Sequence, residues 1–133
     1  MVLDHPLLAV LEPDERRSID ERLLRRSLAP GEVCIEEGAI TTEFFLVLRG
    51  CVEVSRGGRR VASLEAGEFF GESGALDPGP GYTLARNATV TAREATELGV
   101  MTEGDFSALI RSSEPFRTMV YAQLGEIAER ADG

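Results

Sequence analysis

The stretch EFFLVLRGCVEVSRGGRRVASLEAGEFFG, residues 43–71, is the part of this 133-residue chain that decides its fold class. Short apolar runs are separated here by glycine-containing turns, and residues 52–55 alternate between apolar and polar side chains. The Gly57-Gly58 pair between two such runs is a strong signal for a two-residue β-hairpin turn. The stretch therefore predicts a series of short antiparallel strands.

The same pattern continues on both sides of this stretch, from about residue 24 to residue 102. We predict eight strands, and they lie near residues 24–28, 33–36, 43–49, 51–55, 60–64, 69–70, 87–91 and 98–102. Closely spaced glycines mark the turns between most of them. Eight short strands with this spacing favour a mainly β fold, an eight-stranded jelly-roll (double-stranded β-helix) barrel.

Helical spacing of apolar residues flanks the predicted barrel at both ends of the chain. Over residues 4–24 we predict two short helices, with the second beginning at Pro13, because proline suits the first turn of a helix. Over residues 103–131 we predict two more helices, one capped by Thr102 and one capped by Ser112 or Ser113. We therefore expect one domain, residues 1–133, with the barrel over residues 24–102.

Composition excludes several kinds of chemistry. All 14 basic residues are arginine, so lysine-dependent phosphate loops and Schiff bases are ruled out, and the single histidine, His5, provides no cluster for a metal. We expect no catalytic and no metal-binding residues. The net charge of −9 argues against nucleic acid binding by this chain alone. No apolar run is long enough to span a membrane, and Cys34 and Cys51 read as reduced thiols in a cytoplasmic protein.

Two segments carry the recognisable chemistry: GESGAL, residues 71–76, after the strand that contains Phe70, and RNATV, residues 86–90. Gly71 allows close approach of the backbone to a ligand. The residues after it suit a short helix whose free N–H groups bind an anion. Glu72 accepts hydrogen bonds from hydroxyls, and Arg86 is a forked donor for a phosphate. A ligand with a hydroxyl beside a single phosphate would satisfy these groups.

These segments resemble the phosphate-binding cassette of the cyclic-nucleotide-binding domain, found in catabolite-activator-type transcription factors, cAMP-dependent kinase regulatory subunits and cyclic-nucleotide-gated channels. The glycine turns and the flanking helices fit the same family along nearly the whole chain. The resemblance implies a non-catalytic regulatory module that binds cAMP, or alternatively cGMP, and repositions its C-terminal helices. Its expected binding residues are Phe70, Gly71, Glu72, Ser73, Gly74, Ala75, Arg86 and Asn87.

The roles implied by the resemblance are specific. Glu72 would accept a hydrogen bond from the ribose 2′-hydroxyl, and Arg86 would pair with the cyclic phosphate. The backbone N–H groups of Gly74 and Ala75 would complete the phosphate site, with Asn87 beside it. The resemblance also implies that the last helix acts as a lid over the base, and the candidate shielding residues are Phe116, Met119 and Val120.

Some alternatives stay open at this point. Glu72 and Arg86 could pair with each other in a domain without a ligand, which would then be an interaction or scaffold module of the same fold. A cupin-type enzyme has a similar barrel but needs several histidines around a metal. The amide of Asn87 is both donor and acceptor, so it leaves the choice of base undecided. The final helix could also mediate a homodimer or bind a partner protein.

Overall fold

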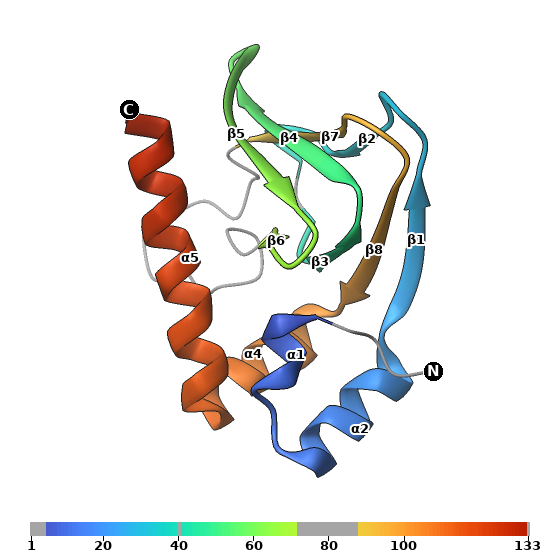
Figure 1. Cartoon of the computed structure of the whole chain (residues 1–133), viewed down its shortest axis with the longest axis vertical. Coiled ribbons are helices and arrows are strands. Elements are labelled where there is room, and N and C mark those ends of the chain that lie inside the picture. Colours follow the sequence, from blue (N-terminus) through green and yellow to red (C-terminus); the bar gives the residue numbers. More distant parts are fainter. Residues whose placement is uncertain (1–4, 40, 72–87, 133) are drawn as a thin grey trace.

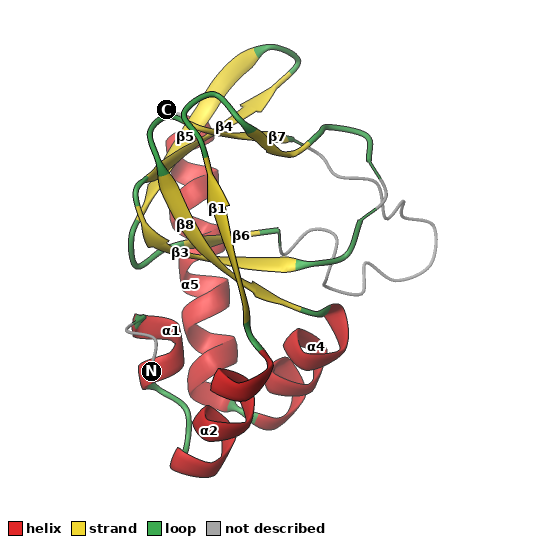
Figure 2. Cartoon of the chain, turned by 90° about the vertical axis from the view of Figure 1, so that its right-hand side faces the viewer, coloured by secondary structure: helices red, strands yellow, loops and turns green. Residues whose placement is uncertain are grey.

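Two facing β-sheets form the centre of the structure, and helices lie at one end and along one side of them (Figures 1 and 2). The computed structural model describes residues 5–39, 41–71 and 88–132, with side chains described as far as Gln123. Within these residues there are eight strands: β1 (Leu24–Leu28), β2 (Val33–Ile35), β3 (Phe44–Arg49), β4 (Cys51–Arg56), β5 (Arg59–Glu65), β6 (Phe69–Phe70), β7 (Thr89–Ala92) and β8 (Thr96–Met101).

The described strands divide equally between the two sheets. One sheet has the strand order β1-β8-β3-β6 and the other has the order β2-β7-β4-β5, and neighbouring strands in both are antiparallel. The hairpin between β4 and β5 turns at Gly57-Gly58, which confirms the prediction from the sequence. The expected closed eight-stranded barrel is not confirmed, because these strands form two open sheets with four edge strands.

The described helices are α1 (Pro6–Ala9), α2 (Pro13–Arg22), α4 (Glu103–Ser112) and α5 (Glu114–Asp132). Pro13 begins α2, as predicted. The Thr102 hydroxyl accepts a hydrogen bond from the Asp105 N–H (3.2 Å), and the Ser113 hydroxyl accepts one from the Phe116 N–H (3.3 Å), so two of the predicted caps are confirmed. In the described part of the chain, no helix has the length and hydropathy to cross a membrane.

Strand β3 separates two hydrophobic cores, because successive side chains of a strand point to opposite faces. Phe44 and Leu46 face the helices, and Phe45 and Val47 face the second sheet. We call the first the helical core; it also contains Leu7, Leu8, Leu11, Ile19, Phe69, Met101, Phe106, Leu109, Phe116 and Val120. We call the second the inter-sheet core; it also contains Leu28, Ile35, Val52, Leu64, Phe70, Val90, Ala92, Leu98 and Val100.

The turn between β3 and β4 is held to the start of β8 by one buried side chain, Thr96. Its hydroxyl accepts a hydrogen bond from the Cys51 N–H (3.2 Å) and lies 3.1 Å from the Cys51 carbonyl and 2.9 Å from the Glu94 carbonyl. Gly50, the residue before Cys51, has φ +92°, and a Cβ added to Gly50 would lie 2.6 Å from the Ala95 carbonyl oxygen. Only glycine therefore fits this contact.

Candidate functional site

The site expected from the sequence is bounded by residues that the structure describes on both sides. Phe70 and Gly71 lie at one boundary and Ala88 lies at the other. The remaining expected binding residues, Glu72, Ser73, Gly74, Ala75, Arg86 and Asn87, lie outside the described residues. The structure therefore describes the two flanks of the expected site.

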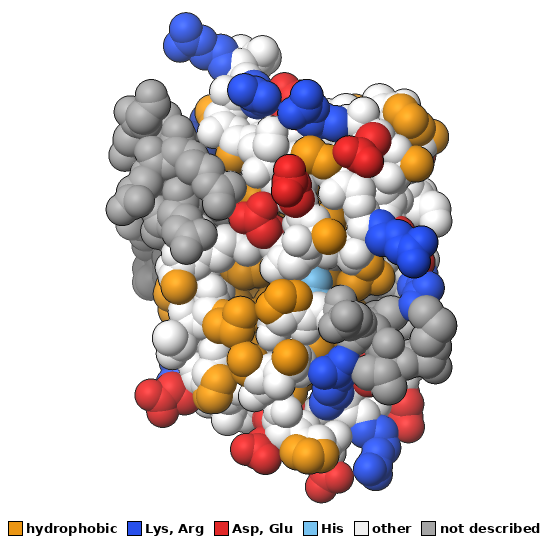
Figure 3. All heavy atoms as spheres, viewed as in Figure 1, with side chains coloured by type: hydrophobic (Ala, Val, Ile, Leu, Met, Phe, Trp, Pro, Cys, Tyr) orange, Lys and Arg blue, Asp and Glu red, His pale blue; other side chains and the backbone are white. Residues whose placement is uncertain are grey.

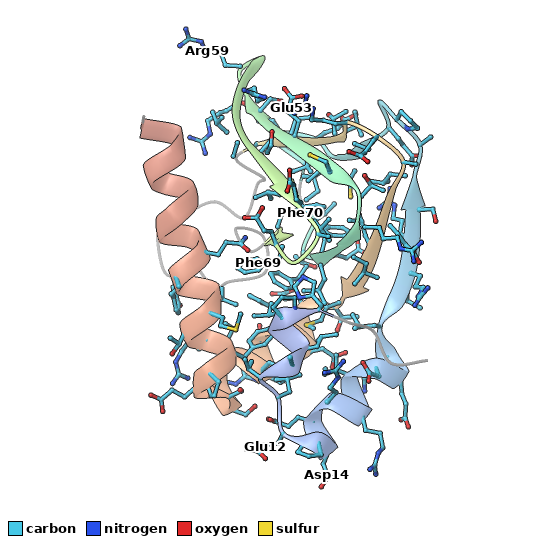
Figure 4. All side chains as sticks on the ribbon, in the orientation of Figure 1. Glu12, Asp14, Glu53, Arg59, Phe69 and Phe70 are labelled. Carbon is cyan, nitrogen blue, oxygen red and sulfur yellow. The ribbon has the colours of Figure 1, made fainter. Side chains whose placement is uncertain are left out.

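The first flank is the two-residue strand β6. Phe69 and Phe70 pair with Leu46 and Phe45 of β3, and because their side chains alternate, each lies in a different core (Figure 4). The Phe70 ring stacks on Phe45 with 4.9 Å between ring centroids and an interplanar angle of 13°. Gly71 follows, buried and with φ +95°, a conformation that L side chains rarely adopt. Strand β6 is thus followed by a buried position whose backbone conformation favours glycine.

The second flank is the start of β7 in the opposite sheet. Ala88 and Val90 are buried, and Val90 belongs to the inter-sheet core, whereas the Thr89 hydroxyl accepts a hydrogen bond from the Glu37 N–H (3.0 Å). Since β6 and β7 belong to different sheets, the chain between Gly71 and Ala88 passes from one sheet to the other. The expected cassette therefore joins the two sheets.

The space between the sheets is apolar wherever the structure describes it. Phenylalanine and aliphatic side chains fill it, and no arginine, aspartate or glutamate among the described residues is buried anywhere in the molecule. Exposed charged side chains include Arg56, Arg59 and Arg60 at the tip of the β4–β5 hairpin (Figures 3 and 4). A buried site for a charged ligand would need its charged residues from the segment between the two flanks.

The lid residues expected from the family lie elsewhere in this structure. Phe116 and Val120 are fully buried in the helical core, and Met119 packs against the same core. The Phe116 ring contacts Phe106 of α4 edge-on, with 5.9 Å between centroids. These side chains face the helices in this arrangement of α5, and their role in shielding the ligand stays a prediction.

Two polar residues next to the site were missed by sequence reasoning. His5 and Gln123 are buried, and each lies within hydrogen-bond distance of a backbone carbonyl of residues 68–69, where β6 begins. One signal for Gln123 was available, because it stands three residues after Val120 and seven after Phe116, at the spacing of the apolar face of α5.

The described residues contain no group of three or more histidine, cysteine, aspartate or glutamate side chains that could hold a metal ion. Neither Cys34 nor Cys51 forms a disulfide. Cys51 is buried, and this burial raises the pKa of its thiol by desolvation, so the nucleophilic thiolate is disfavoured. The chemistry that the described part of the site offers is packing and backbone hydrogen bonding.

The sequence matches a known protein family and several of its members. The model of the cyclic nucleotide-binding domain matches residues 25–113. The chain is 32% identical over 105 residues to the cAMP-dependent protein kinase regulatory subunit of Hypocrea atroviridis, covering 79% of this chain and 22% of that protein. It is 31% identical over 87 residues to the cGMP-dependent protein kinase of Toxoplasma gondii, covering 65% of this chain and 8% of that protein. The chain therefore spans a quarter or less of either relative.

Solved structures agree with this match. The cAMP-bound structure of PfPKA-R superposes with a TM-score of 0.81 at 22% identity, covering 98% of this chain and 44% of that one, which is a likeness of fold. The catabolite activator protein of Thermus thermophilus superposes with a TM-score of 0.73 at 32% identity, covering 96% of this chain and 60% of that one.

Proposed function

The chain belongs to the cyclic-nucleotide-binding domain family, and we propose that it holds its nucleotide at the segment that joins β6 to β7. The chain is thus a cyclic-nucleotide-binding regulatory domain, similar to those of the kinase regulatory subunits. Our placement of the ligand rests on the arrangement of the two flanks. They lie in facing sheets around an apolar interior, and the described residues place no arginine or carboxylate inside it.

Glu72 and Arg86 are the residues that we propose for polar recognition. Glu72 directly follows the buried Gly71, and Arg86 stands two residues before the buried Ala88, so both are at the ends of the connecting segment. In this role Glu72 accepts a hydrogen bond from the ribose 2′-hydroxyl, and Arg86 makes a forked, charge-assisted contact to the cyclic phosphate. Ser73, Gly74, Ala75 and Asn87 complete the phosphate site, largely through backbone N–H groups.

We propose cAMP as the ligand, with cGMP as the competing candidate. Relatives that are named as cAMP-dependent and as cGMP-dependent kinases both match the chain, so family membership leaves the base undecided. Asn87 is the side chain that we expect to bear on this choice, since its amide can donate to one base and accept from another.

Residues 1–133 act as one domain, because β3 is shared by the helical core and the inter-sheet core, and the two sheets are the halves of a jelly roll. The domain is a binding module and not an enzyme, and its place is the cytoplasm. Ligand binding shifts α5, which requires that the nucleotide bind two arrangements of this helix with different affinity. The same helix serves a homodimer or a partner protein.

A thermal unfolding series with cAMP, cGMP and 3′,5′-cyclic CMP tests nucleotide binding directly. A ligand at about 100 times its dissociation constant stabilises the folded state by about 2.7 kcal/mol, which is easily measured in a domain of this size. We expect cAMP to raise the melting temperature most. If none of the three raises it, the chain is the ligand-free interaction module and the proposal is wrong.

The substitution Arg86→Ala tests the assigned site. Removing a charge-assisted phosphate contact is expected to weaken cAMP binding by about 2 kcal/mol, roughly thirtyfold, as measured by calorimetry. The matched control is Arg59→Ala, which removes the same charge at the exposed hairpin tip. The control should bind like the parent chain. Equal affinities for Arg86→Ala and the parent would remove Arg86 from the site.

A further inference from the structure

Two successive backbone carbonyls at the start of β6 are each bonded to a side chain from a distant part of the chain. The Glu68 carbonyl lies 2.9 Å from Nε2 of His5, which precedes α1. The Phe69 carbonyl accepts a hydrogen bond of 2.8 Å from Nε2 of Gln123 in α5. These residues are separated by 63 and 54 positions in the sequence, so the strand that leads to Gly71 is tied to both ends of the chain.

His5 makes this contact as the neutral imidazole. Its Nδ1 accepts a hydrogen bond from the Leu7 N–H (3.0 Å), and because a backbone N–H can only donate, Nδ1 carries no proton. The proton of the neutral ring is then on Nε2, which donates to the Glu68 carbonyl. His5 is 1% exposed, so this geometry is held by the surrounding packing. One side chain thereby caps α1 and fixes β6.

Gln123 reaches β6 from the apolar face of α5. Its side chain is buried, and its amide donates to the carbonyl of Phe69, which faces away from β3. The neighbouring Glu68 carbonyl, in contrast, also accepts a hydrogen bond from the Val47 N–H of β3 (2.9 Å). Strand β6 is an edge strand, which has a row of backbone groups without a strand partner. Gln123 satisfies one of these groups where a further strand is absent.

Packing leaves a space beside Gln123, between α5 and the start of β6. A pocket of about 220 Å³ borders the bond between Gln123 and Phe69, and its walls are formed by Leu7, Gly67, Glu68, Phe69, Met119 and Gln123. Where side chains leave such a space, fewer contacts oppose a displacement of the helix. The directional bond from Gln123 therefore has a larger share in setting the distance between α5 and β6.

We propose that His5 and Gln123 are positioning residues of the ligand site, which hold β6, and with it Gly71, in the binding position. The inference rests on the proposed function, since it concerns affinity for the cyclic nucleotide. A two-residue strand paired on one side has few backbone bonds of its own, so two more bonds are a large part of its support. Affinity consequently depends on the docking of α1 as well as on that of α5.

Two variants remove the bonds: one nearly conserves the volume of the side chain, and the other keeps a cap for α1. Gln123→Met keeps a long, flexible side chain but has no donor for the Phe69 carbonyl. His5→Asn keeps an oxygen that can cap α1, because asparagine is a good N-cap residue, but it is too short to reach Glu68. We expect each variant to bind cAMP about three- to tenfold more weakly than the parent, the effect of one hydrogen bond.

Thr96→Val is the matched control, since it removes a buried hydrogen-bonding hydroxyl at the β4–β8 contact, away from β6. It should bind cAMP like the parent in calorimetry. Amide hydrogen exchange is the second readout: the amides of residues 67–71 should exchange faster in Gln123→Met and His5→Asn, and at the parent rate in Thr96→Val. This readout separates positioning from a general loss of stability.

The outcomes are distinguishable. Weaker binding and faster exchange in both variants, with neither in Thr96→Val, would support the proposal. Parent-like affinity in both variants would overturn it, as would an equal loss of affinity in Thr96→Val. If the parent chain itself binds no cyclic nucleotide, the proposed function fails as well, and that result is obtained from the parent alone before any variant is compared.

Discussion

The two faces of β3 differ in how they are held to the rest of the molecule. On one face, Phe44 and Leu46 contact helices from both ends of the chain; on the other, Phe45 and Val47 contact strands of the second sheet. The helical core holds an aromatic cluster in which Phe44 stacks on Phe106 at 4.1 Å and lies 5.2 Å from Phe69. Buried polar side chains, His5 and Gln123, border this core.

The two cores differ in the kind of bonds that hold their elements together. Strands of the inter-sheet core are joined by backbone ladders along their lengths, so a displacement there breaks many bonds at once. Helices α1 and α5 meet β6 through the apolar packing around Phe69 and through one side-chain hydrogen bond each, so fewer directional bonds oppose a displacement there. We infer that ligand-linked movement is confined to the helical side.

The largest expected effects come from Phe44→Ala and Phe45→Ala, which remove one ring from each core. Both rings are buried, so each change should lower the free energy of unfolding by about 3–5 kcal/mol, measured by urea denaturation. The difference should lie in where exchange protection is lost: in α4 and α5 for Phe44→Ala, and in both sheets for Phe45→Ala.

The milder pair Phe44→Leu and Phe45→Leu serves if either alanine variant fails to fold. Identical maps of exchange protection for the two positions would show that the cores do not open separately. Ligand-linked movement would then not be confined to the helical side.

An intermediate effect is expected from Thr96→Val, which removes a directional contact on the sheet side. The valine is similar in shape, but the buried Cys51 N–H loses its acceptor, which costs about 1–3 kcal/mol of unfolding free energy. Thermal unfolding measures the loss. The companion Thr96→Ser keeps the hydroxyl and should recover most of it, and a serine variant as unstable as the valine one would assign the effect to the methyl group.

The smallest effect is expected from Arg22→Ala, at an exposed contact between the helices. Arg22 donates to Asp105 at 2.6 Å, but its side chain is 61% exposed, so screening by solvent leaves about 0.2–1 kcal/mol. The loss should shrink further in high salt, as seen by repeating the unfolding curve at about 1 M sodium chloride. A salt-independent loss would indicate that packing of the arginine stem, and not its charge, holds α2 to α4.

Local chemistry explains why the elements themselves could be predicted. Proline at residue 13, the hydroxyls of Thr102 and Ser113, and the Gly57-Gly58 pair act within a few residues of their own position, and each begins or ends an element as expected. Of the expected site, the structure describes Phe70 and Gly71, at the end of a strand as predicted. The roles of Glu72 and Arg86 stay predictions.

The sequence by itself determined the order of the strands and helices and the turns between them, because these depend on contacts between near neighbours in the chain. It also contained the motif that resembles a phosphate-binding cassette. Only the tertiary structure decided that β6 pairs with β3 while β7 joins the other sheet, that two open sheets stand where a barrel was expected, and that Phe116 and Val120 face the helices. It also turned His5 and Gln123 into buried donors for β6. The hydrogen bonds from His5 and Gln123 join residues more than 50 positions apart in the sequence. Periodicity along the chain does not encode which distant side chain meets a given carbonyl.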